Sequence, residues 1–422
     1  MSSLISICLF LALPSCAAAE GRPVMASLAD SVPAAEPTAP PPGAAERAEP
    51  LKDWTVLVYI NGKNNLEPFG LKDLNEMETA GSTDRVNVVA ELGRIAGYSA
   101  EDGDWKTVRR YLVQKDSNSS KVTSPVLQEL PRVDMGDYRS LVDFGRWAKT
   151  RFPARRYLLI VWNHGSGWKR GPASARGISY DDETGSHISV PQLALALSEL
   201  GGVDIYASDA CLMQMAEVVY ELKDQAAYIV GSEETEPADG YSYGPFLARL
   251  AAQPAMAPAE LAAAVADAYS QYYSGNDTAS TLSFVRTSAL PAFLSAVRVF
   301  TGEMTRSGDR AAAVRAAKES KSYTYRENKD LYDFVRRVGE TSADPGVRAA
   351  AARLNSVIKD QLVGYNRTTN STGGPWGANP VDNTNSNGLA VYLPGAAAAD
   401  GYAGLRWSAD SSWDEFIAWL AD

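Results

Sequence analysis

Two residues of this 422-residue chain stand out for the chemistry that they can do together, His164 and Cys211. The chain has two histidines and three cysteines, and Cys8 and Cys16 lie in its first sixteen residues. A thiol attacks as the thiolate, and an imidazole can take its proton and return it to a leaving amine. The alternatives on residue type alone are an inert buried Cys and a His hydrogen-bonded in a loop.

The elements that would position these residues alternate between strands and helices. Short apolar runs predict strands at 54–62, 86–92, 157–165, 203–209 and 226–234. Helical patterns lie between them, at 68–80, 138–151, 190–200 and 212–224. The alternation predicts an α/β fold with a mostly parallel central sheet flanked by helices on both faces. The more alternating run 108–113 is expected in a hairpin or at a sheet edge.

Reactive groups in open α/β sheets collect just beyond the carboxyl ends of the strands. His164 and Gly165 end the third predicted strand, and Asp209 and Cys211 follow the fourth. The fifth strand leads into an acidic segment with Glu233, Glu234, Glu236 and Asp239. Adjacent parallel strands would bring these three groups side by side.

The rest of the chain suggests further parts. We expect the catalytic core at 51–275 and, packed on it, a C-terminal α/β extension at 276–422. Within the extension the sequence predicts helices, a strand at 281–287, a polar loop at 366–387 and a last strand at 388–394.

The N-terminus has the pattern of an export signal. An apolar run from Leu4 to Leu13 is followed by small residues, so 1–19 are expected to be a signal segment. The string Leu13-Pro14-Ser15-Cys16 is also similar to a bacterial lipoprotein box, which would place a lipid on Cys16 and the chain on a membrane. Residues 20–50, rich in Ala, Pro and Glu, are expected to form a disordered tether or pro-segment. The chain is therefore expected to be secreted, periplasmic or lipid-anchored at the cell surface.

Charge and composition exclude several classes of function. Forty basic and fifty-one acidic residues give a net charge of −11, which argues against nucleic acid as a partner and is compatible with a cationic substrate. No zinc, phosphate-loop or dinucleotide pattern appears. The acidic run Asp181, Asp182 and Glu183 lacks the spacing of an EF-hand and is expected to be a solvated turn.

Four ordered blocks carry a specific resemblance: YLLIVWNHGSGW, ISYDDETGSHISVPQLALAL, VDIYASDACLMQMAEVVYEL and GSEETEPADGYSY. Together they resemble the clostripain family of cysteine peptidases, relatives of the caspases, from about Trp54 to Leu250 and more loosely to the end. The resemblance implies a caspase-like fold and a catalytic dyad of His164 and Cys211. It further implies an oxyanion hole formed by the backbone N–H groups of Gly165 and Cys211.

The resemblance also implies specificity for a basic residue before the cut bond, Arg or else Lys. Asp209 is then a pocket carboxylate, with the alternative that it caps a helix beginning near Leu212. Asp239 is a second candidate for the pocket, with a solvated turn as its alternative.

Relatives also suggest self-processing, for which Arg176 in the loop KRGPASARGISY is the first choice, and the use of calcium. Two other functions stay open at this point. One is a cysteine peptidase with non-basic specificity, and the other is an inactive exported binding protein on the same fold. The oligomeric state is not predicted.

Overall fold

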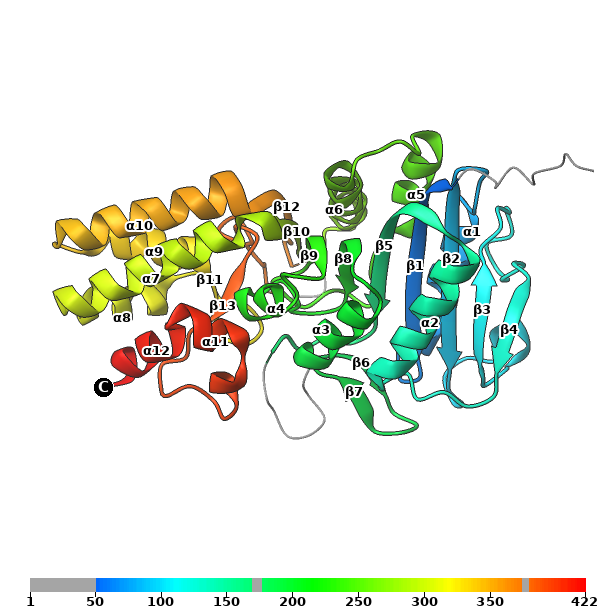
Figure 1. Cartoon of the computed structure of the whole chain (residues 1–422), viewed down its shortest axis with the longest axis horizontal. Coiled ribbons are helices and arrows are strands. Elements are labelled where there is room, and N and C mark those ends of the chain that lie inside the picture. The colour runs from blue at the N-terminus through cyan, green and yellow to red at the C-terminus, as the bar shows by residue number, and fades with distance from the viewer. Residues whose placement is uncertain (1–50, 169–176, 374–378) are drawn as a thin grey trace, which may run out of the picture. The chain divides into compact units, whose positions relative to one another are not determined.

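The computed structural model describes residues 51–168, 177–373 and 379–422, and Pro50–Asp422 form one compact unit. A nine-stranded sheet runs through this unit in the order β12-β10-β9-β8-β5-β1-β2-β3-β4 (Figure 1). Its strands are β1 (Lys52–Gly62), β2 (Val86–Arg94), β3 (Val108–Leu112), β4 (Val126–Leu130), β5 (Ala154–Trp162), β8 (Val203–Asp209), β9 (Ala226–Gly231), β10 (Ser280–Arg286) and β12 (Val363–Thr369).

The five central strands are parallel, and two antiparallel strands extend the sheet on each side. This confirms the predicted α/β fold with its mostly parallel core, and it places 108–113 next to the edge strand β4. β10 and β12 lie beyond residue 275, so the C-terminal segment contributes two strands to the same sheet as the N-terminal ones.

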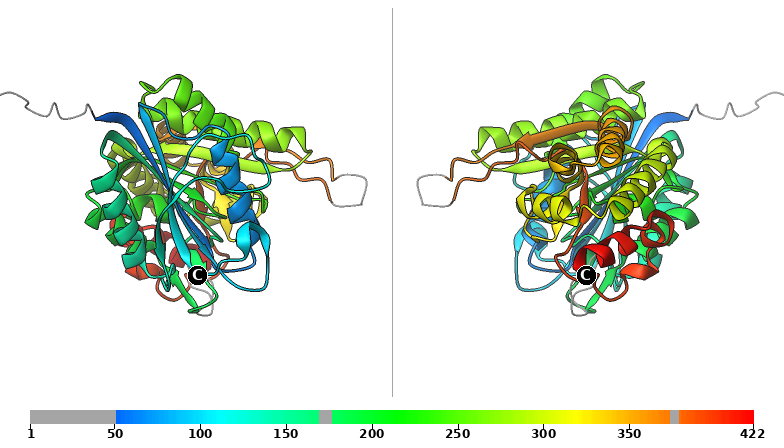
Figure 2. Two further views of the ribbon diagram at one scale, coloured as in Figure 1. Left: turned by 90° about the vertical axis from the view of Figure 1, so that its right-hand side faces the viewer. Right: turned by 90° about the vertical axis from the view of Figure 1, so that its left-hand side faces the viewer.

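Helices cover both faces of the sheet, as predicted (Figure 2). Because successive side chains of a strand point to opposite faces, Leu57 and Tyr59 of β1 enter one apolar cluster and Val56 and Val58 enter the other. The first cluster includes side chains from α2 (Tyr138–Arg151), α3 (Val190–Glu199) and α4 (Ala216–Glu221). The second includes side chains from α1 (Glu67–Glu78), α5 (Tyr243–Ala252) and α6 (Pro258–Gly275).

The remaining elements are a hairpin, a small two-stranded sheet and mostly C-terminal helices. The hairpin consists of β6 (Ile178–Asp181) and β7 (Ser186–Ile188), and the small sheet of β11 (Asn328–Asp330) and β13 (Ala390–Tyr392). The longer helices are α7 (Leu290–Ser307), α8 (Arg310–Glu319), α9 (Leu331–Thr341), α10 (Pro345–Val357), α11 (Arg406–Ser411) and α12 (Trp413–Ala421). Short helical turns are η1 (Glu101–Gly103), η2 (Thr287–Ala289), η3 (Ile358–Leu362) and η4 (Tyr402–Gly404).

The predicted helix at 212–224 is shorter than expected. Leu212 has a left-handed backbone with φ 63°, and its N–H donates to the carbonyl of Glu234 at 3.1 Å. The chain after Cys211 thus bonds to the segment after β9 before α4 begins at Ala216. The residue at the N-terminal end of α4 is Met215, so the alternative that Asp209 caps this helix is wrong.

Two predicted boundaries near the C-terminus also differ. The first residues of the predicted loop 366–387 continue the edge strand β12, which pairs with β10. Further along the chain, Asn383 donates its side-chain amide to the carbonyls of Ser280 and Thr369, one on each of the two paired strands. The last predicted strand is reduced to β13, and it pairs with β11 instead of joining the main sheet. Polar residues suit β12 because an edge strand is partly exposed to solvent.

Candidate active site

The carboxyl ends of β5 and β8 bring the predicted catalytic residues together. In the parallel register Trp162 lies opposite Asp209, so His164 and Cys211 each follow two residues beyond a paired position. Both line a cavity of about 300 Å³, together with Asp209 and Glu236. The structure therefore gathers at this edge the groups that the sequence placed at separate strand ends.

The thiol of Cys211 is mostly shielded from solvent. Its Sγ accepts a hydrogen bond from the backbone N–H of Glu236 at 3.2 Å. Burial raises the pKa of the Cys211 thiol above its ordinary value, although this hydrogen bond acts in the opposite direction. The protonated thiol is therefore favoured at rest.

His164 is held by a side chain that also lines the cavity. A hydrogen bond joins its Nε2 to Oδ1 of Asn65 at 2.7 Å. Burial lowers the pKa of the His164 imidazole, and the charge of Asp182 only partly opposes this effect. A neutral imidazole that lines the same cavity as a protonated thiol is suited to act as a general base when the thiol attacks.

Gly165 packs directly against the nucleophile. A Cβ added at this position would lie 2.4 Å from the carbonyl oxygen of Cys211 and 3.1 Å from its backbone nitrogen. Only glycine fits so close an approach. The two residues predicted to supply the oxyanion hole are thus in contact.

Asp209 and Glu236 form a pair of buried carboxyl groups in the same cavity. Asp209 accepts hydrogen bonds from the hydroxyl of Tyr243 at 2.7 Å and from the N–H of Tyr241. Burial raises the pKa of Asp209 to about 6, against the lowering effect of these bonds. Neither buried oxygen of Glu236 accepts a hydrogen bond of normal geometry from a described residue, although the N–H of Ala210 acts on this carboxyl group and lowers its pKa in part. Burial, and then the charge of Asp209, raises the pKa of Glu236 well above its ordinary value. The pair therefore favours a state that holds at least one proton.

The other acidic candidates point elsewhere. The carboxylate of Asp239 lies 2.5 Å from Nζ of Lys72 and 2.8 Å from the hydroxyl of Tyr272, and Asp239 is not among the residues that line the cavity. Glu233 is buried and accepts hydrogen bonds from Tyr323 and from the N–H of Gly388.

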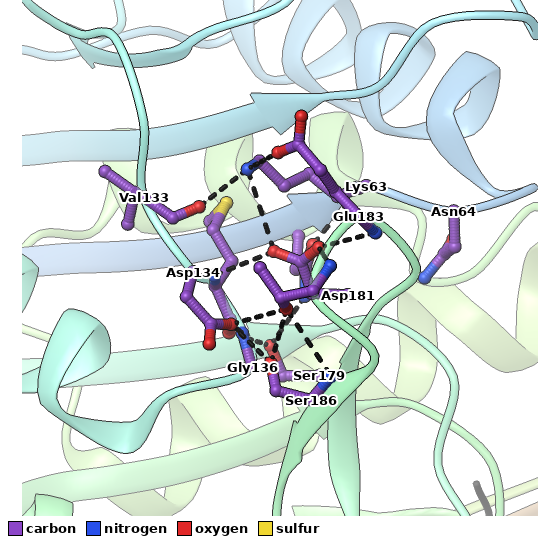
Figure 3. Close-up of polar contacts among 12 residues, drawn as sticks. Lys63, Asn64, Val133, Asp134, Gly136, Ser179, Asp181, Glu183 and Ser186 are labelled. Carbon is purple, nitrogen blue, oxygen red and sulfur yellow. Dashed lines mark hydrogen bonds and ion pairs between the residues drawn. The ribbon is translucent and has the colours of Figure 1, made fainter. Parts of the chain in front are cut away.

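The acidic turn considered for calcium contains a buried ion pair (Figure 3). Nζ of Lys63 lies 2.5 Å from Glu183 and 3.7 Å from Asp181, and it donates to the carbonyl of Val133. Asp181 also accepts from the N–H of Met135. Because the Lys63 ammonium lies against both carboxylates, it already occupies the place where a cation would bind. These residues do not fit a calcium ion. In the described ranges no group of three or more Asp, Glu, His or Cys could hold a metal.

The remaining residues singled out from the sequence are His187 and Arg176. His187 on β7 stacks on the ring of Tyr180, with 5.2 Å between the centroids, and does not line the cavity. The candidate processing residue Arg176 lies outside the described residues.

Sequence reasoning missed Asn65, which contacts His164. A signal was available, since Asn64 and Asn65 lie two and three residues beyond the end of the first strand, at the same carboxyl edge as the other candidates.

A thiol and an imidazole in one cavity, at the carboxyl edge of a mainly parallel α/β sheet, define the class of cysteine-dependent hydrolases. Comparison with known proteins agrees. The chain belongs to the clostripain family, whose model matches residues 58–419.

Individual relatives are more distant. Clostripain of Hathewaya histolytica is 28% identical over 221 residues, which cover 47% of this chain and 42% of that protein. A secreted C11 cysteine protease from Bacteroides thetaiotaomicron, solved with an irreversible peptide inhibitor, superposes with a TM-score of 0.67 at 22% identity. An inactive zymogen C11 protease from Parabacteroides distasonis gives 0.64 at 21%. Each alignment covers 86% of this chain and 99% of the other, and at these identities the likeness shows the caspase-like fold.

The resting protonation state of Cys211 and His164 leads to a prediction about thiol reactivity. In the full chain with Cys8 and Cys16 replaced by Ala, Cys211 is the only cysteine. Because burial raises the pKa of its thiol, the rate of alkylation by iodoacetamide should climb by about tenfold per pH unit through neutral pH and beyond pH 8. A small free thiol, measured alongside as the control, should level off at lower pH. A plateau already present near pH 6 would instead indicate a thiolate–imidazolium pair.

Proposed function

We propose that this chain is a cysteine endopeptidase that cuts peptide bonds after basic residues, Arg or else Lys. One observation carries the proposal. Cys211 and His164 share their cavity with two buried carboxyl groups, Asp209 and Glu236. The first pair supplies the chemistry of acyl transfer, and the second supplies an acidic pocket for the side chain before the cut bond.

The reaction follows from the geometry of the first pair. Sγ of Cys211 bonds to the carbonyl carbon while its proton passes to His164, and the carbonyl π electrons move onto oxygen. The backbone N–H groups of Gly165 and Cys211 donate to that oxyanion. The carbon–nitrogen bond then breaks as His164 returns the proton to the leaving amine. Water attacks the thioester with His164 as base, which releases the acid and restores the thiol.

Specificity follows from the second pair. A buried carboxylate that faces a neutral side chain is left without a counter-charge, whereas a guanidinium pairs with it through two parallel hydrogen bonds. Binding of a cation displaces the proton that Asp209 and Glu236 hold. Arg is favoured over Lys because its planar fork matches a carboxylate.

Processing and export belong to the same proposal. We infer cleavage after Arg176, and the residue that follows is tied to the segment of His164, since Gly177 donates its N–H to Oγ of Ser166 at 3.0 Å. One similar structure is described as an inactive zymogen and another as a secreted protease, which supports both ideas for this chain. Residues 1–19, Cys16 and the segment 20–50 lie outside the described residues, so export and lipid attachment stay predictions. In the part of the chain that is described, no helix is long and apolar enough to cross a bilayer.

The dyad is tested by removing each member. Cys211→Ala and His164→Ala should lower hydrolysis of an Arg-containing fluorogenic peptide by at least about 1,000-fold, because nucleophile and base act as a unit. Circular dichroism should not change, since both side chains sit at the sheet edge and neither is fully buried. His187→Ala is the control and should stay active. Full activity in Cys211→Ala would refute the mechanism. A wild type that is inactive and is not labelled by a peptidyl chloromethyl ketone would favour the alternative of an inactive binding protein on the same fold.

The pocket is tested by kcat/KM for peptides with Arg, Lys, Gln or Asp before the bond. Asp209→Asn and Glu236→Gln should each lower the value for Arg by a factor of tens to roughly a thousand, because a charge-assisted contact is lost, and should change the value for Gln little. As the pH falls below about 6, Asp209 becomes protonated and KM for the Arg peptide should rise.

Asp239→Asn is the matched control for the pocket, because its carboxylate is bonded to Lys72 and Tyr272. It should keep the wild-type preference for Arg. If it abolishes the preference while Asp209→Asn and Glu236→Gln retain it, Asp239 is the specificity residue. If the wild type prefers Gln or Asp, the enzyme is a cysteine peptidase with non-basic specificity.

Self-processing is tested on the purified full chain. N-terminal sequencing of the wild type should reveal a second chain that starts at Gly177, and Cys211→Ala should lack it. Arg176→Gln should also remain uncut at this position. A fully active wild type that remains a single chain would contradict self-processing.

A further inference from the structure

Asn65 contacts the imidazole of His164 from a neighbouring segment of the chain. It lies in the segment after β1, whereas His164 follows β5, and β1 and β5 are parallel neighbours with Ile60 opposite Trp162. Oδ1 of Asn65 is 2.7 Å from Nε2 of His164, and both residues line the cavity that contains Cys211. A carbonyl oxygen at this distance accepts a hydrogen bond from an imidazole N–H.

The backbone on the N-terminal side of Asn65 is fixed by buried side chains (Figure 3). Lys63 is 2% exposed, and its ammonium donates to the carbonyl of Val133 and lies 3.7 Å from the buried carboxylate of Asp181. Asn64 is 1% exposed, and its amide donates to the carbonyl of Tyr180 at 2.8 Å. Removing one partner of such a buried contact is costly, so this segment has little freedom to move.

The same contacts tie this segment to the one that carries His164. Asn163 donates its amide to the carbonyl of Asn61 at 2.5 Å and accepts from the N–H of Tyr180 at 2.7 Å. Tyr180 on β6 is therefore held by Asn64 from one segment and by Asn163 from the other. Asn65 and His164, the next residues along each segment, are held in a fixed relation.

We propose that Asn65 is a positioning residue that selects the tautomer of His164. Its carbonyl holds the proton on Nε2, so the lone pair that accepts the Cys211 proton is on Nδ1. When the thiol transfers its proton to Nδ1, Nε2–H of the resulting imidazolium still donates to Asn65, now as a stronger charge-assisted bond. The role in catalysis rests on the proposed peptidase function, whereas the tautomer does not.

The opposite orientation of the amide makes the opposite prediction. If the NH₂ group of Asn65 faced His164, Nε2 would have to accept, the proton would be on Nδ1, and Nε2 would be the basic nitrogen. The position of one proton therefore decides between the two arrangements.

That proton can be located without any measurement of activity. The chain has only two histidines, so the full chain carrying His187→Gln and ¹⁵N-labelled histidine gives the ring signals of His164 alone. Multiple-bond ¹H–¹⁵N spectra of the neutral ring should show a protonated Nε2 and an unprotonated Nδ1. In the same background Asn65→Ala should give a mixture of tautomers. A protonated Nδ1 in the protein with Asn65 intact would overturn the proposal.

Kinetics of Asn65 variants test the catalytic consequence. Asn65→Ala should lower kcat by about 10- to 100-fold with little change in KM, a part of the roughly 10²–10⁴ that a general base supplies. Asn65→Asp keeps the acceptor and adds a negative charge. It should recover most of kcat and shift the acid limb of the pH profile upward, because the charge favours the imidazolium. A merely structural role would give neither the recovery nor the shift.

The outcomes separate the proposal from the proposed function. Unchanged kcat in Asn65→Ala would overturn the positioning role even if the peptidase is active. An inactive wild type that still shows the Nε2–H tautomer would contradict the peptidase function and leave the tautomer assignment standing. If Asn65→Ala fails to fold, Asn65→Asp and the spectra of the protein with Asn65 intact still decide the matter.

Discussion

The parallel register between β5 and β8 is the constraint on which the site depends. Trp162 lies opposite Asp209, and the ladder continues one residue further, where the N–H of Asn163 donates to the carbonyl of Asp209 at 3.2 Å. His164 and Cys211 then leave the sheet from equivalent positions, and both line the cavity at its edge. Because side chains alternate along a strand, a slip of one residue would turn every side chain of the slipped strand to the opposite face and separate the two groups. The apolar clusters on both faces prevent such a slip, so the packing of the core also sets the geometry of catalysis.

Burial keeps the resting site close to electrical neutrality. It favours the thiol of Cys211, the neutral ring of His164 and a protonated state of the pair formed by Asp209 and Glu236. The charge of Cys211 also raises the pKa of Glu236, so a thiolate and an ionised Glu236 oppose each other. In the proposed mechanism a guanidinium resolves this conflict, since it neutralises the carboxylates that would otherwise disfavour the thiolate. Recognition of a basic side chain would then assist the chemical step as well as binding.

The fold and the cluster of candidates could be predicted because they depend on local patterns. Apolar runs identify the parallel strands, and the carboxyl-edge rule places polar residues together without any coordinates. The errors arise where a distant partner decides the outcome. Leu212 bonds to the segment of Glu234 instead of starting a helix. Nothing in the sequence likewise indicated that Asp239, a candidate for the pocket, pairs with Lys72 of α1, 167 residues earlier. Asn65 was missed for a different reason, since asparagine seldom suggests acid–base chemistry until its contact with an imidazole is known.

The C-terminal segment supports both catalytic loops at once. Trp168, four residues after His164, packs edge-on against Tyr392 and Tyr402, with 4.7 and 4.6 Å between ring centroids. On the side of Cys211, the carbonyl of Gln214 accepts from the N–H of Ala390, two residues before Tyr392. The strands of the core lead into the loops that carry the reactive side chains, whereas a segment some 180 to 230 residues further along holds these loops in place. With β10 and β12 also in the main sheet, residues 276–422 act as part of the support of the active site and not as an appended module.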